Sequence, residues 1–539
     1  MIARLLERIE AAEMSFGQAA AAFAGVALVR MFFENLSSPP PAFGGAFDAL
    51  TLIHYFLFYI GVFLSLALVL RIFIPDIKRI SKFLLFGFPI IWLSPIYDLI
   101  ASHGAGARMA YAFVNYGSIA NSFLAMGGTN PLGGITPGLH AELWAIVIGA
   151  GLYVFFKSKK IIRAIAAAAI VYMALFLWMI APSLPAIVYQ MATGSMVPSS
   201  LNFLIAWFSG SRSVQTFLRP TVQLSPAYAI GMTFNLGMGC LLYLLDIVLF
   251  ASWLALADGR ILKAIVRGCR PGRVAHYCVL FTIGILMQTL GAGTPLLGNT
   301  FDALVLAMLA IAFLLAFLYC VGVNNLSDVA IDEISNRNHP LVAGTLSAAE
   351  VQNTDQIFFF AALIGGYLAG YWEFFLIAVF MAAYYIYSAP PLRLKRIPIL
   401  APFLVSIACL SAALGGFYFA DPNKLVADFS WQMAAIIIIC FTLAINIKDI
   451  KDIEGDGAHG VTTIPVAFPR VGKSIVGGLL AAAFLAIPII LGSWALFIPS
   501  LIAGALGYYF VTAEPYREWR IFALYFCYAG VLLAVLAPR

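Results

Sequence analysis

The sequence predicts an all-α protein, a polytopic transmembrane helical bundle of about 15 spans. Its composition is too apolar for a soluble globule, because 63% of the residues are hydrophobic and 10% are charged. Apolar segments of about 20 residues, the length at which a helix crosses a bilayer, recur along the chain. Lys and Arg gather in alternate connections between these segments, which is typical of a membrane protein with a fixed orientation.

Residues 1–257 form the first predicted domain, a membrane module of about six helices with unknown function. Its start, residues 1–13, is charged and amphipathic, which predicts an interfacial helix before the first span. This start has no short apolar region followed by a small-residue cleavage site, so we expect no removable signal peptide. The six apolar segments fall near residues 16–34, 49–74, 83–101, 139–156, 162–182 and 226–256.

A basic stretch rich in Arg and Gly, residues 258–274, is predicted to be a cytoplasmic linker to the second domain, residues 275–539. With the N-terminus inside, the inner connections hold 25 of the chain's 31 Lys and Arg, an alternation that one misplaced helix would scramble. The nine apolar segments of the second domain fall near residues 275–292, 300–323, 355–370, 371–388, 399–418, 431–447, 475–492, 494–511 and 520–537.

An acidic motif, residues 324–347, follows the eighth span. If the helical period continues past the membrane edge, Asn324, Asp328 and Asp332 lie at i, i+4 and i+8 and share one face. The alternative is a cluster of ordinary interfacial acids. Because the other inner connections are basic, the concentration of like charges favours a bound cation.

A second acidic motif, residues 446–465, follows the twelfth span and therefore lies on the same side of the membrane. Asp449, Asp452 and Asp456 are spaced i, i+3 and i+7. Facing carboxylates repel one another, and Mg²⁺ shared with a phosphate relieves this repulsion, since it commonly binds one or two carboxylates plus substrate phosphates. The paired motifs predict a diphosphate substrate handled at a membrane surface.

Together with a basic loop at residues 387–396, the two motifs resemble those of the UbiA family of intramembrane prenyltransferases. That family carries NDxxDxxxD, a YSxPxRLKR-like loop and DxxxD, and this chain has NNLSDVAID, YSAPPLRLKR and DIEGD in the same order. The resemblance covers roughly residues 276–539 and implies a UbiA-like bundle of nine helices. The first 250 or so residues resemble no family that we can name.

The resemblance implies a Mg²⁺-dependent enzyme that transfers a prenyl group from a polyprenyl diphosphate to a lipophilic acceptor within the membrane. Basic side chains in the loop would stabilise the departing diphosphate, although the loop could also be only a positive-inside anchor. Four predicted catalytic residues are also the predicted metal ligands: Asp328, Asp332, Asp452 and Asp456. The other predicted site residues are Lys395 and Tyr387 (catalytic), and Asn324, Asn325, Arg337, Arg393, Asp449 and Lys448 (substrate-binding).

Two positions depart from the family pattern. Asn325 replaces the usual Asp but keeps an oxygen that can bind a metal or its water. His339 replaces an Arg before Pro340, so Arg337 would have to supply the missing phosphate-facing cation. His339 and His459 could be ligands, bases or simply hydrogen-bonded loop residues. The form KDIxDxEGD resembles the branch that prenylates geranylgeranylglyceryl phosphate, homogentisate or chlorophyllide.

Two other functions stay open. The same acid motifs could serve phosphoribosyl transfer onto a polyprenyl phosphate, and a cation transporter would instead need ionisable residues within the spans. We expect an integral, multi-pass membrane protein, in the cell membrane if the source is prokaryotic, with the acidic motifs on the cytoplasmic side and no nucleic-acid partner. The sequence does not indicate prenyl chain length, acceptor identity, organism or oligomeric state.

Polar residues also gather near the outer ends of the second to fourth helices. They predict either a second polar site, for a metal or a lipid head group, or ordinary helix capping and loop hydrogen bonding. These residues are Asp48, His54, Asp98, His103, Arg108, His140 and Glu142.

Overall fold

The computed structural model describes residues 2–37, 48–107, 110–126, 134–218, 226–293, 295–337 and 339–536. In these ranges the regular structure is helical apart from one isolated bridge residue, which confirms the all-α prediction. The chain divides into two compact units. The first comprises Met1–Leu262 with Asn299–Leu304, and the second comprises Lys263–Gly298 with Val305–Arg539.

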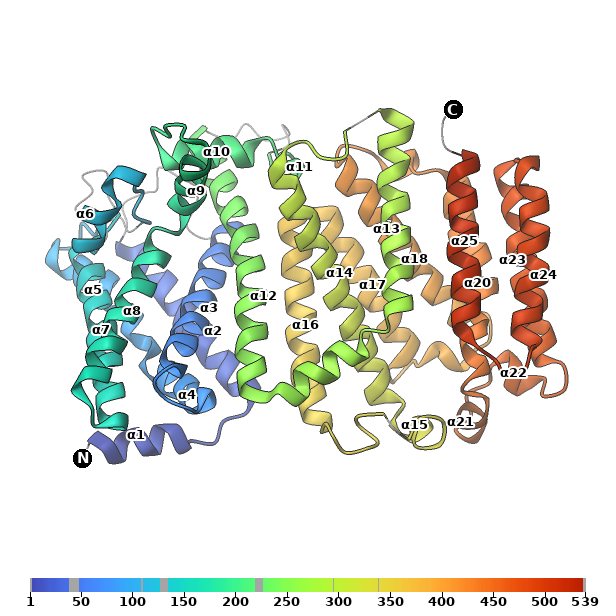
Figure 1. Ribbon diagram of the computed structural model, residues 1–539, viewed down its shortest axis with the longest axis horizontal. Coiled ribbons are helices and arrows are strands. Elements are labelled where there is room, and N and C mark those ends of the chain that lie inside the picture. Colours follow the sequence, from blue (N-terminus) through green and yellow to red (C-terminus); the bar gives the residue numbers. More distant parts are fainter. Residues whose placement is uncertain are drawn as a thin grey trace. The chain divides into compact units, whose positions relative to one another are not determined.

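Long antiparallel helices and several short ones build the first unit (Figure 1). Asp48 begins α3 by accepting a hydrogen bond from the Thr51 backbone amide (2.9 Å), which satisfies an otherwise unpaired donor of the first turn. The helices are α1 (Ile2–Ala11), α2 (Phe16–Ser37), α3 (Ala49–Arg71), α4 (Ile77–Gly87), α5 (Leu93–Ala101), α6 (Ile119–Leu124), α7 (Pro137–Ser158), α8 (Ile161–Met179), α9 (Leu184–Thr193), α10 (Ser200–Ser209), α11 (Arg212–Phe217) and α12 (Pro226–Gly268).

The amphipathic start of the chain forms α1, as the sequence predicts. Leu6 packs into the hydrophobic core of the first unit, and Glu10 is buried beside the last turns of α7. There the Glu10 carboxylate accepts hydrogen bonds from the Tyr153 hydroxyl (3.0 Å) and the Lys157 ammonium (2.7 Å). This buried pairing holds α1 against the end of α7.

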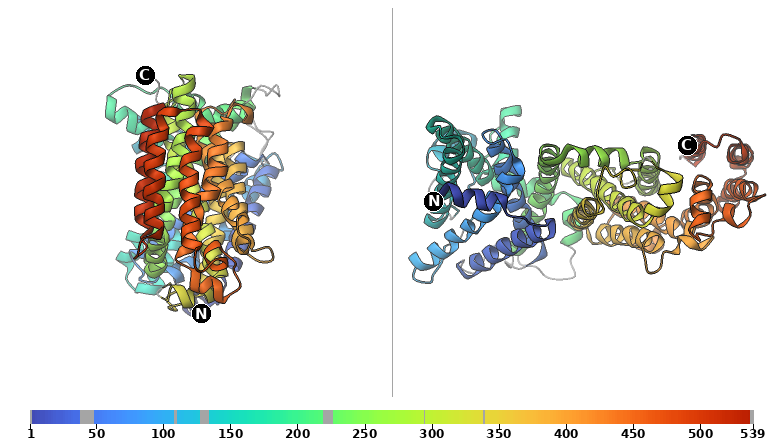
Figure 2. Two further views of the ribbon diagram at one scale, coloured as in Figure 1. Left: turned by 90° about the vertical axis from the view of Figure 1, so that its right-hand side faces the viewer. Right: turned by 90° about the horizontal axis from the view of Figure 1, so that it is seen from below.

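The second unit is a bundle whose long helices stand side by side (Figures 1 and 2). A π-helical turn, Ile436–Cys440, joins α19 to α20 within one continuous span. The helices are α13 (Pro271–Ala292), α14 (Thr300–Ser327), α15 (Val329–Ser335), α16 (Ala348–Ala369), α17 (Tyr371–Ser388), α18 (Leu400–Ala420), α19 (Trp431–Ala435), α20 (Phe441–Ala444), α21 (Ile453–Ala458), α22 (Ile464–Ala467), α23 (Gly472–Leu491), α24 (Phe497–Thr512) and α25 (Glu518–Leu536).

Helix α18 lies at the centre of this bundle and packs against α13 and α17. The contact with α13 is made through glycines. A Cβ on Gly284 would come within 1.9 Å of the Ala413 carbonyl oxygen, and one on Gly416 within 1.9 Å of the Phe281 carbonyl oxygen. Glycine therefore lets the two backbones touch, as is common where membrane helices pack through small residues.

Thirteen runs of helix among the described residues are long and apolar enough to cross a membrane, and they match thirteen of the predicted spans. The other two predicted spans coincide with α13 and α16, each a helix of 22 residues. The protein is therefore an integral, multi-pass membrane protein, while the count of fifteen spans stays a prediction. The predicted linker is largely helical, because α12 continues beyond a break at Asp258 (φ −160°, ψ 87°).

Candidate active site

A cavity of about 830 Å³ lies within the second unit. Its polar end is formed by the two acidic motifs and the basic loop, and α15 and α21 lie together at this end of the bundle (Figure 1). The rest of the wall is apolar and rich in aromatic rings. The aromatic lining residues are Tyr277, Phe317, Tyr384, Phe441, Phe484, Trp519, Phe522, Tyr525 and Tyr528.

The first acidic motif bends at Asp328. Helix α14 ends at Ser327, Asp328 leaves the helical conformation (φ −112°, ψ 11°), and a new short helix, α15, begins. The predicted continuous helical face is therefore wrong. The Asp328 carboxylate accepts a hydrogen bond from Asn324 Nδ2 (3.0 Å). The backbone carbonyl oxygen of Asp328 accepts one from the Asp332 backbone amide (2.8 Å). The three predicted side chains still line one cavity although the helix breaks.

The basic loop between α17 and α18 reaches the same aspartate. Arg393 Nη2 donates to Asp328 Oδ1 (2.9 Å) and to the Ser327 carbonyl oxygen (3.0 Å), and the Lys395 ammonium donates to the same Oδ1. Lys395 and Asp328 are each 7% exposed. A loop that only anchored the protein would turn its charges to water, as Arg396 does, so the burial of Lys395 favours a role in the site.

The second motif repeats this geometry. Asp452 also precedes a short helix, α21, and its carbonyl oxygen accepts a hydrogen bond from the Asp456 amide (2.8 Å). Helices α15 and α21 pack against each other. Each short helix thus carries one aspartate before its first residue and another four positions later, so the two predicted carboxylate pairs converge.

The converging carboxylates repel one another. Burial, together with Asp328 and Asp452, raises the pKa of Asp332 to about 6. Burial, helped by its acidic neighbours, raises the pKa of Asp456 to about 7. A bound cation would reverse these shifts by stabilising the charged forms.

The donor set fits Mg²⁺ that is shared with a phosphate ligand. No group of three or more His, Cys, Asp or Glu side chains in the described ranges is placed to hold a metal by itself. Mg²⁺ does not need such a cage, because it commonly takes one or two carboxylates and completes its shell with water and phosphate oxygens. The two aspartate pairs offer these carboxylates at the polar end of the cavity.

The remaining predicted residues divide into two groups. Asn324, Asp449, Tyr387 and Lys448 line the cavity, and the Lys448 ammonium donates to the Tyr387 hydroxyl (2.7 Å). Asn325, Arg337 and Arg393 are not part of the cavity wall. Arg393 acts on the site through Asp328, Asn325 accepts a hydrogen bond from Arg270 Nη2 (3.4 Å), and Arg337 is exposed.

Sequence reasoning missed two arginines of the cavity wall, Arg270 and Arg273, because they were counted as linker charges. They lie just before α13 and in its first turn. A helix N-terminus carries a partial positive charge, so cations are unfavourable there unless an anion is held nearby. Two arginines at the start of a helix were therefore the signal in the sequence that could have identified them as site residues. Arg270 lies near Asp332 and Asp452, and burial lowers the pKa of its guanidinium.

The two candidate histidines differ. His459 Nδ1 lies 3.0 Å from the Gly455 carbonyl oxygen, which is the hydrogen-bonded loop arrangement. His339 Nδ1 lies 3.9 Å from Asp332 Oδ2, and burial, with Arg270 nearby, lowers the pKa of this imidazole.

In the first unit, several of the predicted polar residues are structural. Asp48 caps α3, and Asp98 accepts hydrogen bonds from the Gly138 amide (2.8 Å) and the Thr136 hydroxyl at the start of α7. His54 is buried, with its ring nitrogens 2.8 Å from Asn235 Oδ1 and from the Tyr111 hydroxyl. Of the others, Arg108 lies outside the described residues and Glu142 lines a separate cavity.

The sequence model of the UbiA prenyltransferase family matches residues 279–535. These residues form a UbiA prenyltransferase family domain. The match confirms the resemblance drawn from the three motifs, which all lie within it. No family model matches the N-terminal half of the chain.

The UbiA domain is similar to several curated proteins. It is 33% identical over 196 residues to homogentisate phytyltransferase of Synechocystis sp., covering 34% of this chain and 62% of the relative. It is 30% identical over 178 residues to probable homogentisate phytyltransferase 2 of Oryza sativa, covering 31% of this chain and 46% of the relative. It is 29% identical over 256 residues to digeranylgeranylglyceryl phosphate synthase of Thermococcus kodakarensis, covering 46% of this chain and 80% of the relative.

Among solved structures, a UbiA homolog from Archaeoglobus fulgidus bound to GPP and Mg²⁺ aligns with a TM-score of 0.39 and 18% identity. The alignment covers 50% of this chain and 97% of that homolog. The same homolog bound to DMAPP and Mg²⁺ aligns with a TM-score of 0.36 and 20% identity, covering 50% of this chain and 99% of that homolog.

Proposed function

We propose that the UbiA domain transfers a prenyl group from a polyprenyl diphosphate to a lipophilic acceptor within the membrane, with Mg²⁺ as cofactor. One observation carries this proposal. Two aspartate pairs and a buried lysine meet at the polar end of a cavity whose other walls are apolar and aromatic. Such a cavity has separate places for a charged diphosphate and for a hydrocarbon chain.

The diphosphate would lie at the polar end, between the aspartates and the cations. Mg²⁺, when bound, would neutralise diphosphate charge, and Asp332, Asp452 and Asp456 would hold it together with Asp328. The bond between the allylic carbon and the diphosphate oxygen breaks with its electron pair on the diphosphate. Lys395 stabilises the charge that develops on this leaving group. The acceptor then forms a bond to the allylic carbon and loses a proton.

The aromatic wall suits the cationic character of the allyl group. Aromatic faces attract cations, and a cavity without bulk water protects a reactive carbocation from hydrolysis. Tyr277 and Tyr384 are held in place by a hydrogen bond between their hydroxyls, and the Tyr277 and Phe380 rings pack edge to face at 5.0 Å. These contacts fix how the Tyr277 and Tyr384 rings face the part of the cavity where the chain of the donor would lie.

The names of the relatives favour an acceptor similar to homogentisate or to a glyceryl phosphate lipid. The test is to incubate purified full-length protein, Mg²⁺ and isotope-labelled prenyl diphosphates of several lengths with a lipid extract of the host. We expect a lipid whose mass has increased by one labelled prenyl group. Absence of any such lipid with every donor would contradict the proposal.

We further propose that the acidic motifs face the cytoplasm, because the inner connections carry most of the Lys and Arg. In a Cys-free background, a Ser158→Cys variant should resist an impermeant thiol reagent in intact cells and react after lysis. A Ser195→Cys variant, on an exposed outer connection, should react in intact cells. The reverse pattern would show that the motifs face outward.

We also propose that residues 1–257 are a separate membrane module, that residues 258–274 are the linker, and that residues 275–539 are the transferase domain. All predicted site residues lie in the second unit. A protein comprising residues 258–539 should therefore keep prenyl transfer. We expect a lower melting temperature, because buried Asp302 loses hydrogen bonds from the Ser211 hydroxyl (2.7 Å) and the Arg212 amide (3.1 Å). A well-folded but inactive protein would contradict the proposal.

A further inference from the structure

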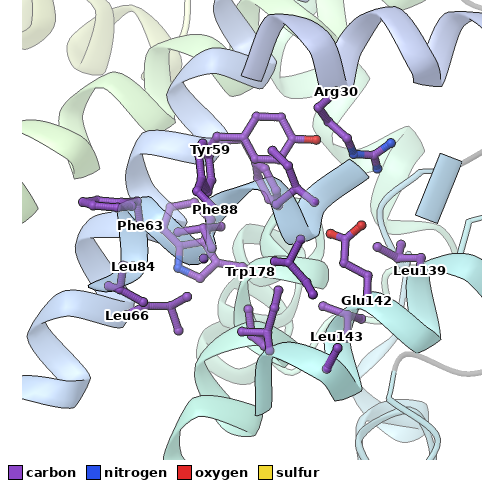
Figure 3. Close-up of a pocket in the computed structure, with 18 of the residues that line it drawn as sticks. Arg30, Tyr59, Phe63, Leu66, Leu84, Phe88, Leu139, Glu142, Leu143 and Trp178 are labelled. Atoms are coloured by element: carbon purple, nitrogen blue, oxygen red, sulfur yellow. The ribbon is translucent and has the colours of Figure 1, made fainter. Parts of the chain in front are cut away.

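A second cavity, of about 260 Å³, lies within the first unit, among α2, α3, α4, α7 and α8. Figure 3 shows that its polar side chains gather in one region, where the Arg30 guanidinium, the Tyr59 hydroxyl and the Glu142 carboxylate approach one another. Phe63, Leu66 and Leu84 form an apolar region of the wall. The cavity is thus amphipathic.

The polar groups are buried within membrane spans. Arg30 is 3% exposed, Glu142 5% and Tyr59 7%. Arg30 Nη1 lies 3.7 Å from the Glu34 carboxylate, and the Ser94 hydroxyl and amide both donate to Glu142 Oε2 (2.5 and 3.4 Å). In the part of the chain that the structure describes, no donor reaches Glu142 Oε1 and no partner bonds the Tyr59 hydroxyl. Ionisable groups inside a membrane are costly and mark functional sites.

The apolar part of the wall is built to accept a ring. Phe58 and Trp178 pack edge to face at 5.5 Å, and the Trp178 indole N–H donates to the Ser65 hydroxyl (3.1 Å). The polar atom of this indole is therefore already satisfied. Aromatic side chains arranged in this way favour an aromatic ligand through stacked or edge-to-face contacts.

We propose that this cavity binds a neutral phenol or quinol that carries one lipophilic chain. The ligand hydroxyl would donate to Glu142 Oε1 and accept from Tyr59. A neutral head group fits better than an anion, because Arg30 is already paired with Glu34 and Glu142 adds a further carboxylate. The cavity is slightly smaller than the ~300–1,000 Å³ typical of small-molecule sites, so it suits one ring with part of one chain.

This binding function is separate from the proposed prenyl transfer, and its test does not depend on that activity. Full-length protein in lipid nanodiscs is exposed to para-octylphenol with a photoreactive diazirine at the end of its chain. After illumination, mass spectrometry locates the label. We expect labelled peptides from α3 or α4, and unlabelled para-octylphenol should compete. The matching octylbenzene probe, which lacks the hydroxyl, should label these peptides at least about threefold less, because it forgoes the hydrogen bonds.

Two variants and one control variant locate the binding. A Cβ on Gly149, which lines the cavity, would meet no atom within 4 Å, so Gly149→Leu can fill the space and should reduce labelling of α3 and α4 at least tenfold. Gly25 also has open space but lies on an exposed face of α2 away from the cavity, so Gly25→Leu should leave labelling unchanged. Tyr59→Phe should reduce labelling by about three- to tenfold.

Three results would overturn the proposal. The first is equal labelling by the phenol and octylbenzene probes, which would show an apolar pocket without selectivity. The second is stronger labelling by a fatty-acid probe with the same chain, which would show that Arg30 selects an anion. The third is labelling that Gly149→Leu does not change, which would place the ligand elsewhere. None of these results bears on prenyl transfer by the second unit.

Discussion

An Asp452→Ala variant is expected to transfer prenyl groups about 10²- to 10³-fold more slowly than the wild type, because groups that stabilise developing charge are typically worth that factor. Asp452 lines the polar end of the cavity, and no ion pair involving it is found among the described residues. Its removal therefore leaves no buried cation without a partner, and the melting temperature should change little. The measurement is the initial rate of transfer against Mg²⁺ concentration.

Glu454→Ala is the matched control. Glu454 lies on α21, two positions after Asp452, and carries the same charge, but it is outside the cavity wall. Its replacement should leave the rate within about twofold of the wild type, because the Glu454 side chain is not part of the wall that would hold the diphosphate. If both variants were equally active, the acidic motifs would have no catalytic role.

A Lys395→Met variant is expected to lose about 10²-fold in rate, because the leaving diphosphate loses a buried cation that is placed to stabilise it. Methionine keeps much of the apolar stem of the side chain. Arg393 Nη2 would still donate to the Asp328 carboxylate (2.9 Å), so this carboxylate keeps a cationic partner. Transfer at saturating donor concentration reports the change.

Arg396→Met tests the anchoring alternative. Arg396 belongs to the same loop but is exposed, so its loss should affect activity little. Equal losses of membrane-inserted protein in the two variants, with normal activity per molecule, would show that the loop serves only as an anchor.

The structure changes which aspartate gives the cleaner test. From sequence, removing Asp328 relieves repulsion between neighbouring acids and should leave folding intact. In the fold, however, Asp328 pairs with Lys395 and Arg393, and Lys395 is buried. Breaking a buried ion pair typically costs about 3–5 kcal/mol. An inactive Asp328→Ala variant would therefore not separate lost chemistry from lost stability.

Local sequence was sufficient for the helices and for the identity of the domain. Long apolar runs need no tertiary information, because a span must satisfy its own backbone hydrogen bonds. Periodicity failed at the motif, since it cannot show that a helix will stop at Ser327 and restart at Val329. The pairing of Asp328 with Lys395 joins residues 67 positions apart, which no local pattern encodes.

The first unit was less predictable for a related reason. Arg30 and Glu34 are the two charged residues of α2, and their sequence environment does not show that Arg30 faces Tyr59 and Glu142. The acids of the two motifs lie at helix ends, whereas other acids of the chain do not. Glu142 and Asp246 are buried within spans.

The donor and the metal requirement test the central claim most directly. Purified full-length protein is given Mg²⁺, a lipid extract of the host, and two donors with different isotopes, geranylgeranyl diphosphate and phosphoribosyl diphosphate. We predict that only the prenyl label enters lipid, that one diphosphate is released for each product molecule, and that a chelator stops both events. Incorporation of the phosphoribosyl label, or prenyl transfer that continues at full rate in the chelator, would contradict the account.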